Sequence, residues 1–288
     1  MDTSRVRLRP RAIEALLAAT WVGLGLGPAG DAAILARHLV EADLAGHPSH
    51  GIGLWPLYLD AAATGALDAT AVLRPAANLG ALLVFDANHG PGQIMAHHAV
   101  ETAIHRAHAQ GHCVLALRDA HHVGRIGTYA EQCAAQGIVS IHLVNVPTSA
   151  IVAPWGGPFG RLGTNPFCAG FPVAGGEPVI VDLATSRWAG GKVRVAMDNG
   201  ETLPDGILLD EAGEPTNDPG KLWSEPRGAL LPMGEHKGYA LALAIELLAG
   251  ALVGGATQNG GPRDAILNSM FSILILSLIH ISEPTRHG

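Results

Sequence analysis

Two short segments combine histidine with glycine in a pattern suited to chemistry on a small molecule. They are residues 46–51 (GHPSHG) and residues 121–127 (HHVGRIG). Histidine has an unperturbed pKa of about 6.5, so it can give and take a proton at neutral pH. Glycine lets the backbone approach a ligand closely. The two segments predict a small-molecule redox site, and residues 234–239 (GEHKGY) support this interpretation.

The second segment is the better candidate for a functional site, because it follows a predicted apolar strand over residues 114–117. Loops beyond the carboxyl ends of strands are where α/β proteins bind ligands, which favours a functional His122. Gly124 and Gly127 would expose the N–H groups of a helix start, which could hold phosphate. Arg125 either pairs with a phosphate or carboxylate or is a solvated residue at the helix start. In the first segment, His50 is either functional or a simple loop residue.

An apolar stretch over residues 178–183 places Asp182 near its end, followed by two hydroxyl side chains. A carboxylate in such a stretch costs free energy unless it has a partner. Asp182 therefore either caps the following segment or orients a histidine or a ribose.

Metal chemistry is the main alternative, because the chain contains 15 histidines. A metal-dependent hydrolase or lyase would need three or four converging ligands. The chain has no H-E-x-x-H motif, and the pairs 97–98 and 121–122 are adjacent, so their side chains point in different directions on regular structure. We expect no metal.

Composition limits the class of protein. Hydrophobic residues make up 48% of the 288 residues and charged residues 15%, which is typical of a well-buried globular enzyme with one large or two modest domains. A net charge of −7 without a basic cluster argues against nucleic-acid binding. The three cysteines form neither a disulfide nor a zinc pattern. The start of the chain lacks the apolar region of a secretion signal, so we expect a cytoplasmic protein without membrane attachment.

Helical periodicity runs through residues 12–23 and 31–44, with Asp31 as the expected N-cap of the second helix. The joining loop contains a formal G-x-G-x-x-G at Gly25, Gly27 and Gly30. A Rossmann fingerprint needs a strand before it, whereas a helical pattern precedes this one. We therefore interpret it as a loop only.

After a helical stretch over residues 52–63 and a turn-rich linker over residues 65–75, strands and helices alternate. Strands are predicted over residues 81–85, 114–117, 138–144, 166–171, 178–183 and 270–275; helices are predicted from the segment 88–93 to residue 110, and over 127–136 and 239–252. The fold class is therefore α/β (or α+β): a helical domain over residues 1–75, followed by a mixed-sheet domain over residues 76–275.

The end of the chain breaks this pattern. Residues 276–286 (LSLIHISEPTR) are similar to the translation of a transposase adapter from sequencing libraries. We expect residues 276–288 to be a non-native tail that replaces the natural continuation of the gene.

Six motifs in order resemble the malate/L-lactate dehydrogenase family, whose members lack a Rossmann fold. They are residues 46–51, 120–127, 161–166 (RLGTNP), 182–186 (DLATS), 215–219 (PTNDP) and 235–240 (EHKGYA). Residues 130–135 (AEQCAA) and 264–268 (DAILN) are similar to the hydroxycarboxylate dehydrogenase B branch. The resemblance covers residues 10–275.

The resemblance implies a homodimeric enzyme that interconverts 2-oxo and 2-hydroxy acids with NAD or NADP. It implies His50 and His122 as acid/base candidates, with Ser49 and Arg125 at the substrate. The implied cofactor contacts are His50, Gly124, Arg125, Ile126, Val181, Asp182, Leu183, Ala184 and His236. The family chain continues after the strand at residues 272–275, so this copy is expected to lack a C-terminal part of the helical domain.

Three positions depart from the family pattern: Pro48 replaces a common Asp, Ala120 a Ser or Asn, and Leu54 an Arg found in related branches. Without an arginine at position 54, Arg125 becomes the expected partner of the substrate carboxylate. We expect His50 to be the proton donor, with His122 as the alternative. A third interpretation is that the 288-residue chain is a non-catalytic fragment with exposed apolar surface.

Overall fold

The structure is a computed structural model that describes residues 8–148, 150–258 and 266–277. Its N-terminal part consists of the helices α1 (Pro10–Gly23), α2 (Ala29–Leu44) and α3 (Trp55–Thr64), with the 3-10 turns η1 (Pro48–His50) and η2 (Ile52–Leu54) between α2 and α3. Their apolar faces meet around buried Trp21, Leu35, Leu39 and Tyr58. Ile94 of the next domain joins this cluster, so the helical part is packed onto the remainder of the chain.

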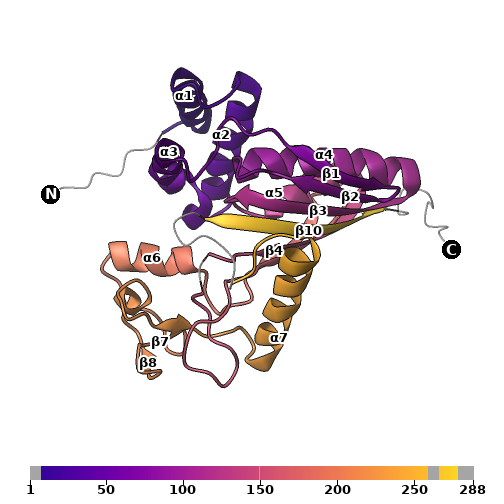
Figure 1. The fold of residues 1–288 in the computed structure, drawn as a ribbon. Coiled ribbons are helices and arrows are strands. Elements are labelled where there is room, and N and C mark those ends of the chain that lie inside the picture. Colours follow the sequence, from indigo (N-terminus) through magenta and orange to yellow (C-terminus); the bar gives the residue numbers. More distant parts are fainter. Residues whose placement is uncertain (1–7, 149, 259–265, 278–288) are drawn as a thin grey trace.

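A seven-stranded mixed sheet forms the centre of the molecule (Figure 1). Its order is β1-β2-β3-β10-β4-β5-β6, and β2 and β3 are parallel whereas the other neighbours are antiparallel. The parallel pair is joined by the crossover helix α4, as parallel strands require. The strands are β1 (Arg74–Leu79), β2 (Leu82–Asp86), β3 (His112–His121), β4 (Ile138–Asn145), β5 (Phe167–Phe171), β6 (Val179–Leu183) and β10 (Leu267–Leu276).

Helices cover both faces of this sheet. On one face lie α4 (Gly92–Gln110) and α5 (Gly127–Ala134), whose small side chains, such as Ala99 and Ala130, allow close packing on the strands. On the other face lies α7 (His236–Ile245), which continues as the π-helix η4 (Glu246–Leu252) and packs through Ile245 and Ala249 against Leu143. Figure 1 shows α4 and α7 on opposite sides of the sheet.

A smaller unit packs beside the sheet. It contains α6 (Gly190–Asp198), the 3-10 turn η3 (Pro219–Leu222) and a three-stranded sheet ordered β8-β7-β9. Its strands are β7 (Leu208–Leu209), β8 (Pro215–Thr216) and β9 (Ala229–Leu230). Val193, Leu208, Leu222 and Leu230 form its core.

The predicted fold class is confirmed, and the predicted long helices and strands occur with small shifts at their ends. The predicted N-cap is wrong: Pro28 is the N-cap of α2, and the Asp31 carboxylate instead bonds His98 Nε2 at 2.9 Å. The predicted linker over residues 65–75 extends into β1, whose mostly exposed side chains carry no hydrophobic alternation. The sequence analysis did not find α6.

The G-x-G-x-x-G segment connects α1 to α2 without a preceding strand, as predicted. All three cysteines are free and buried. Within the described ranges, no helix is both long and apolar enough to span a membrane. Leu276, the first residue of the expected tail, is the last residue of β10 and pairs with Ile138. Residues 278–288 of that tail lie outside the described residues.

One buried histidine links the fold to pH. His142 of β4 is fully buried between Ser272 Oγ (2.8 Å from Nδ1) and Ser140 Oγ (3.0 Å from Nε2). Burial lowers its pKa to about 3. In the unfolded chain the His142 imidazole binds a proton near pH 6.5, whereas in the folded chain it binds one only near pH 3. His142 therefore makes folding less favourable as the pH falls through this window.

We expect His142→Asn to flatten the dependence of unfolding free energy on pH. Below pH 6.5 the native chain should lose about 1.4 kcal/mol per pH unit through His142 alone, and the variant should lack this contribution. Urea unfolding at a series of pH values from neutral downward measures the slope. Identical slopes for the two proteins would show that His142 is not held neutral by the fold.

Candidate active site

A cavity of about 470 Å³ lies where the helical part, the large sheet and the smaller unit meet. This size is typical of small-molecule sites. We call it the histidine cavity, because His50 and His122 both line it. The sequence motifs at residues 46–51 and 121–127, about 70 residues apart, therefore converge on one site.

His50 comes from η1, the short turn after α2. Its Nδ1 lies 3.0 Å from Ser49 Oγ, and its ring stacks on the His122 ring with centroids 5.6 Å apart. Burial lowers its pKa to about 4, and the positive charges of neighbouring His47, Arg125 and Lys192 contribute in the same direction. His50 is therefore a neutral imidazole at pH 7.

His122 directly follows β3, an inner strand, and therefore lies where the carboxyl end of that strand leaves the sheet. Its Nδ1 lies 2.6 Å from the hydroxyl of Tyr58, which in turn accepts a hydrogen bond of 2.6 Å from Gln93 Nε2. Burial lowers the pKa of His122 well below its ordinary value. Tyr58 and Gln93 were not predicted from the sequence, because they belong to helices and carry no motif. The available signal was a polar group on a buried helix face.

Gly124 and Ile126, two of the residues predicted to contact a cofactor, also line the histidine cavity. Gly124 has a φ of 73°, and a Cβ there would lie 2.7 Å from His38 Nε2. Glycine is thus needed both for the backbone conformation and for the close approach to α2. The loop between β3 and α5 can therefore lie flat against the cavity wall.

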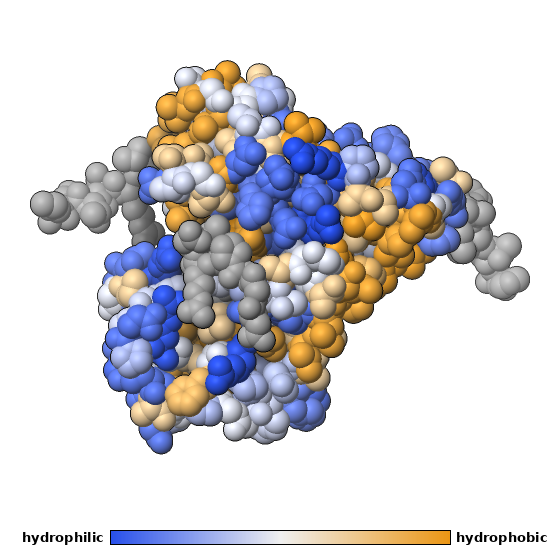
Figure 2. Space-filling view, in the orientation of Figure 1, coloured by the Kyte–Doolittle hydropathy of each residue, from blue (hydrophilic) through white to orange (hydrophobic). Residues whose placement is uncertain are grey.

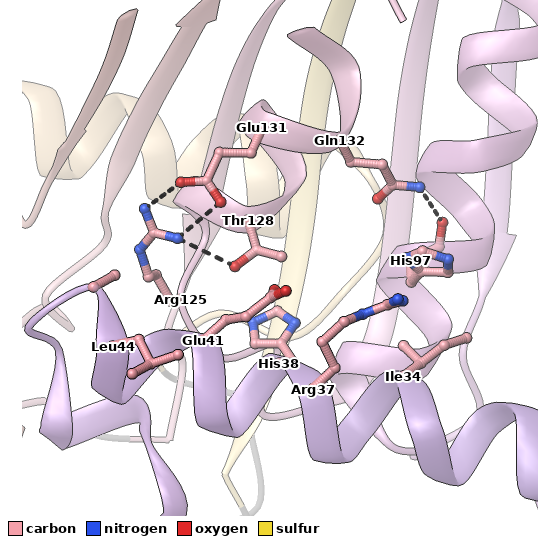
Figure 3. Close-up of a pocket in the computed structure, with 11 residues that line it drawn as sticks. Ile34, Arg37, His38, Glu41, Leu44, His97, Arg125, Thr128, Glu131 and Gln132 are labelled. Atoms are coloured by element: carbon pink, nitrogen blue, oxygen red, sulfur yellow. Dashed lines mark hydrogen bonds and ion pairs between the residues drawn. The ribbon is translucent and has the colours of Figure 1, made fainter. Parts of the chain in front are cut away.

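Arg125 points elsewhere. Its guanidinium bonds the Glu131 carboxylate (Nη2–Oε1 2.6 Å and Nη1–Oε2 3.0 Å) and lines a second cavity between α2 and α5 (Figure 3). This pairing raises the pKa of Arg125. Arg125, which was expected to bind the substrate carboxylate, therefore forms an ion pair with Glu131 and does not line the histidine cavity.

Asp182 has a different partner from those expected. Its Oδ2 accepts the N–H of Gly127 at 2.9 Å, so the carboxylate occupies the first amide of α5 that could have held a phosphate. Burial raises the pKa of Asp182. Asp182 was expected to cap the segment that follows it or to orient a histidine or a ribose. It instead accepts the first N–H of α5, a helix that begins 55 residues earlier in the chain. The contact brings the segments 124–127 and 181–184 together.

The remaining predicted cofactor residues lie outside the lining of the histidine cavity. Val181 and Leu183 belong to the edge strand β6, and Ala184 follows it. His236 is the exposed first residue of α7, with its ring centroid 6.4 Å from that of Trp155. The structure thus unites Ser49, His50, His122, Gly124 and Ile126 but places His236 apart from them.

The smaller unit supplies a wall that the sequence analysis missed. Gly190, Gly191 and Arg194 of α6 line the cavity, and the Arg194 guanidinium carbon lies 5.1 Å from the ring centroid of Trp223. A Cβ on Gly191 would lie 2.5 Å from Ser49 Cβ, so α6 approaches η1 as closely as a glycine permits. The paired glycines before Lys192 were the only sequence signal.

Apolar and amide groups complete the cavity. Leu54, Leu57 and Ala61 form an apolar wall. At the sheet edge, Asn268 of β10 accepts the N–H of Val123 at 3.0 Å and donates to the Asn145 carbonyl at 3.0 Å. This single side chain bridges the ends of β3 and β4. No group of three or more potential metal ligands is found in the described part of the chain.

Comparisons with known proteins show the family of the chain. Residues 8–277 match the family model described as malate/L-lactate dehydrogenase. Hydroxycarboxylate dehydrogenase B of Escherichia coli K12 is 45% identical over 249 residues, which are 85% of this chain and 69% of that protein.

Two solved structures have the same fold. An E. coli protein assigned to the malate/lactate dehydrogenases superposes with a TM-score of 0.92 at 41% identity, covering 98% of this chain and 79% of that one. The Δ1-piperideine-2-carboxylate reductase of Pseudomonas syringae pv. tomato gives a TM-score of 0.85 at 34% identity, covering 94% and 82%.

The family match and the relatives, which are hydroxy acid dehydrogenases, place the chain in the class of NAD(P)-dependent oxidoreductases of 2-hydroxy acids. The chain belongs to the malate/L-lactate dehydrogenase family.

The contact between Gly191 and Ser49 can be tested directly. We expect Gly191→Ala to lower the unfolding free energy by about 1–3 kcal/mol, because the added methyl group must push α6 away from η1. The displacement of Ser49 should also weaken NADH binding, which nucleotide fluorescence measures. Gly30→Ala in α2, where a Cβ meets nothing within 4 Å, is the matched control; it should raise the unfolding free energy by about 0.4–1 kcal/mol, because alanine favours the helix, and leave NADH binding unchanged. Equal behaviour of the two variants would contradict the tight α6–η1 contact.

Proposed function

We propose that the histidine cavity catalyses the reversible reduction of a 2-oxo acid to a 2-hydroxy acid with NAD(P)H. The observation that carries this proposal is the stacked pair of His50 and His122 in one cavity, on two segments that meet only through the fold. The names of the relatives, which include hydroxycarboxylate, L-lactate and sulfolactate dehydrogenases, support the substrate class.

The cavity fits a nicotinamide cofactor. Ile126, Val144 and Val146 offer apolar surface for a flat ring. Outside the cavity lining, the segment over residues 181–184 and the exposed His236 remain proposed contacts for the rest of the cofactor. When bound, the nicotinamide supplies the hydride, and the protein supplies orientation and proton chemistry.

We assign the role of proton donor and acceptor to His50. In the reductive direction its imidazolium would protonate the oxygen at C2, and in the oxidative direction the neutral ring would take that proton back. Ser49 Oγ, 3.0 Å from Nδ1, fixes the ring so that the opposite nitrogen is the one available for transfer. His122 then remains for hydrogen bonding to the same oxygen.

We assign the substrate carboxylate to Arg194 and Ser49. Among the described residues that line the cavity, Arg194 carries the permanent positive charge, and Trp223 holds its guanidinium in place. Arg125, the candidate from the sequence, has its charge satisfied by Glu131. The apolar wall formed by Leu54, Leu57 and Ala61 would face the substrate side chain.

We also propose that the full-length protein is a cytoplasmic homodimer. Four leucines of α7 and η4 (Leu243, Leu247, Leu248 and Leu252) are exposed, and Figure 2 shows an apolar band beside α7. Such a surface is typical of a protein interface. The buried free cysteines fit a reducing compartment.

Replacing the proton donor tests the proposed reaction. We expect the native chain to oxidise NADH or NADPH only when a 2-oxo acid is present, and His50→Gln to lower kcat about 10²–10⁴-fold. The affinity for the reduced cofactor should change little. Loss of NADH absorbance and quenching of NADH fluorescence measure the two quantities. His105→Gln, on the exposed side of α4, is the control and should retain full activity. A native kcat in the His50→Gln protein would show that another group transfers the proton.

The pKa of His50 predicts opposite pH profiles for the two directions. For oxidation of the hydroxy acid, kcat/KM should stay level from neutral pH down to about 4 and fall below it, because protonation removes the base. For reduction, kcat/KM should rise as the pH falls towards about 4, because the donor becomes populated. Initial rates after brief exposure to each pH measure both profiles. Parallel profiles in the two directions would contradict the assignment.

A further inference from the structure

A buried hydrogen-bond relay joins three separate elements behind His122. Gln93 lies in the first turn of α4 and is 1% exposed, and Tyr58 of α3 is 2% exposed. Gln93 Nε2 lies 2.6 Å from the Tyr58 hydroxyl, and that hydroxyl lies 2.6 Å from His122 Nδ1. The relay therefore runs from the helix α4, through the helical part, to the end of β3.

Counting protons along the relay fixes its direction. The Gln93 amide donates to the Tyr58 oxygen, so the single hydroxyl proton of Tyr58 is free to point at His122 Nδ1. That nitrogen must then present a lone pair. A neutral histidine with a lone pair on Nδ1 carries its hydrogen on Nε2.

The other nitrogen of His122 is available to a ligand. His122 lines the histidine cavity, and Nε2 has no hydrogen-bond partner among the described residues. An N–H group at this position can donate a hydrogen bond to an oxygen that gains negative charge. It cannot readily give up its proton, because the relay would then have to leave a phenolate on buried Tyr58.

We propose that Gln93 and Tyr58 are positioning residues that hold His122 as the neutral Nε2–H tautomer, so that it donates a hydrogen bond to the C2 oxygen of the substrate while His50 transfers the proton. The role towards the substrate rests on the proposed function, whereas the tautomer does not. Burial, which lowers the pKa of His122 and raises that of Tyr58, acts in the same direction.

The tautomer can be measured without cofactor or substrate. Long-range ¹H–¹⁵N correlation spectra of the full chain distinguish a protonated from an unprotonated ring nitrogen, and His122 is identified by the signals lost in His122→Gln. We expect hydrogen on Nε2 and a lone pair on Nδ1 at neutral pH. Hydrogen on Nδ1, or on both nitrogens, would overturn the proposal.

Gln93→Glu should reverse the relay. A carboxylate at position 93 accepts the Tyr58 proton, so the Tyr58 oxygen becomes an acceptor for hydrogen on His122 Nδ1. We expect the His122 spectrum to change accordingly, while the signals of His142, which bonds Ser140 and Ser272, stay in place as an internal control. An unchanged His122 spectrum in a folded Gln93→Glu protein would show that the relay does not set the tautomer.

Kinetics separate this role from a merely structural one. Gln93→Glu and Tyr58→Phe should each lower kcat by about 10²-fold, the effect of losing one donor to a developing oxyanion, with the KM for NADH unchanged. His105→Gln, on the exposed side of the same helix as Gln93, is the control and should retain full kcat. If the spectra are as expected but no 2-oxo acid is reduced, the proposed function fails and the tautomer stands. If kcat is unaffected in all variants, the hydrogen bond to substrate is refuted.

Discussion

The insertion of β10 between β3 and β4 is the constraint on which the site depends. Residues 267–276 pair with both neighbours over most of their length, so the strand joins two halves of the sheet that would otherwise share no hydrogen bonds. The side chain of Asn268 also links the two halves, because it accepts the N–H of Val123 after β3 and donates to the carbonyl of Asn145 at the end of β4. Because β3 ends beside His122 and β4 ends beside Val146, this pairing sets the floor of the cavity.

Above that floor, the helical part and the smaller unit each contribute one wall. Ser49, His50 and Leu57 come from the segment between α2 and the end of α3, whereas Gly191 and Arg194 come from α6. The two walls meet where Gly191 touches Ser49. A cavity assembled from three parts can change volume when one part moves, and the absence of a side chain at Gly191 sets how far it can close.

Burial determines the charge states in this site. The pKa values of His38, His50, His121 and His122 are all lowered, with loss of solvation as the largest cause. Several neutral imidazoles can therefore lie close together without repulsion. Among the described residues, other histidines lie at exposed positions, such as His105 of α4 and His236 of α7.

The sequence by itself determined the elements whose periodicity is strong, including α1, α2, α4 and β10, and the two histidine–glycine motifs. These features are local: apolar spacing and glycine content act within a few residues. Strands such as β1 and the helix α6 were missed because β1 exposes both faces and α6 is short, with two glycines in its first turn.

Only the tertiary structure decided which way each site residue points. Arg125 and His122 lie three positions apart in one motif, yet Arg125 bonds Glu131 of α5 and His122 bonds buried Tyr58 of α3. The direction of a loop side chain is set by the partners that the fold brings near it. Tyr58 and Gln93 lie 64 and 29 residues from His122 in the sequence, and Asp182 lies 55 residues from its partner Gly127. Such long-range partners leave no trace in local spacing.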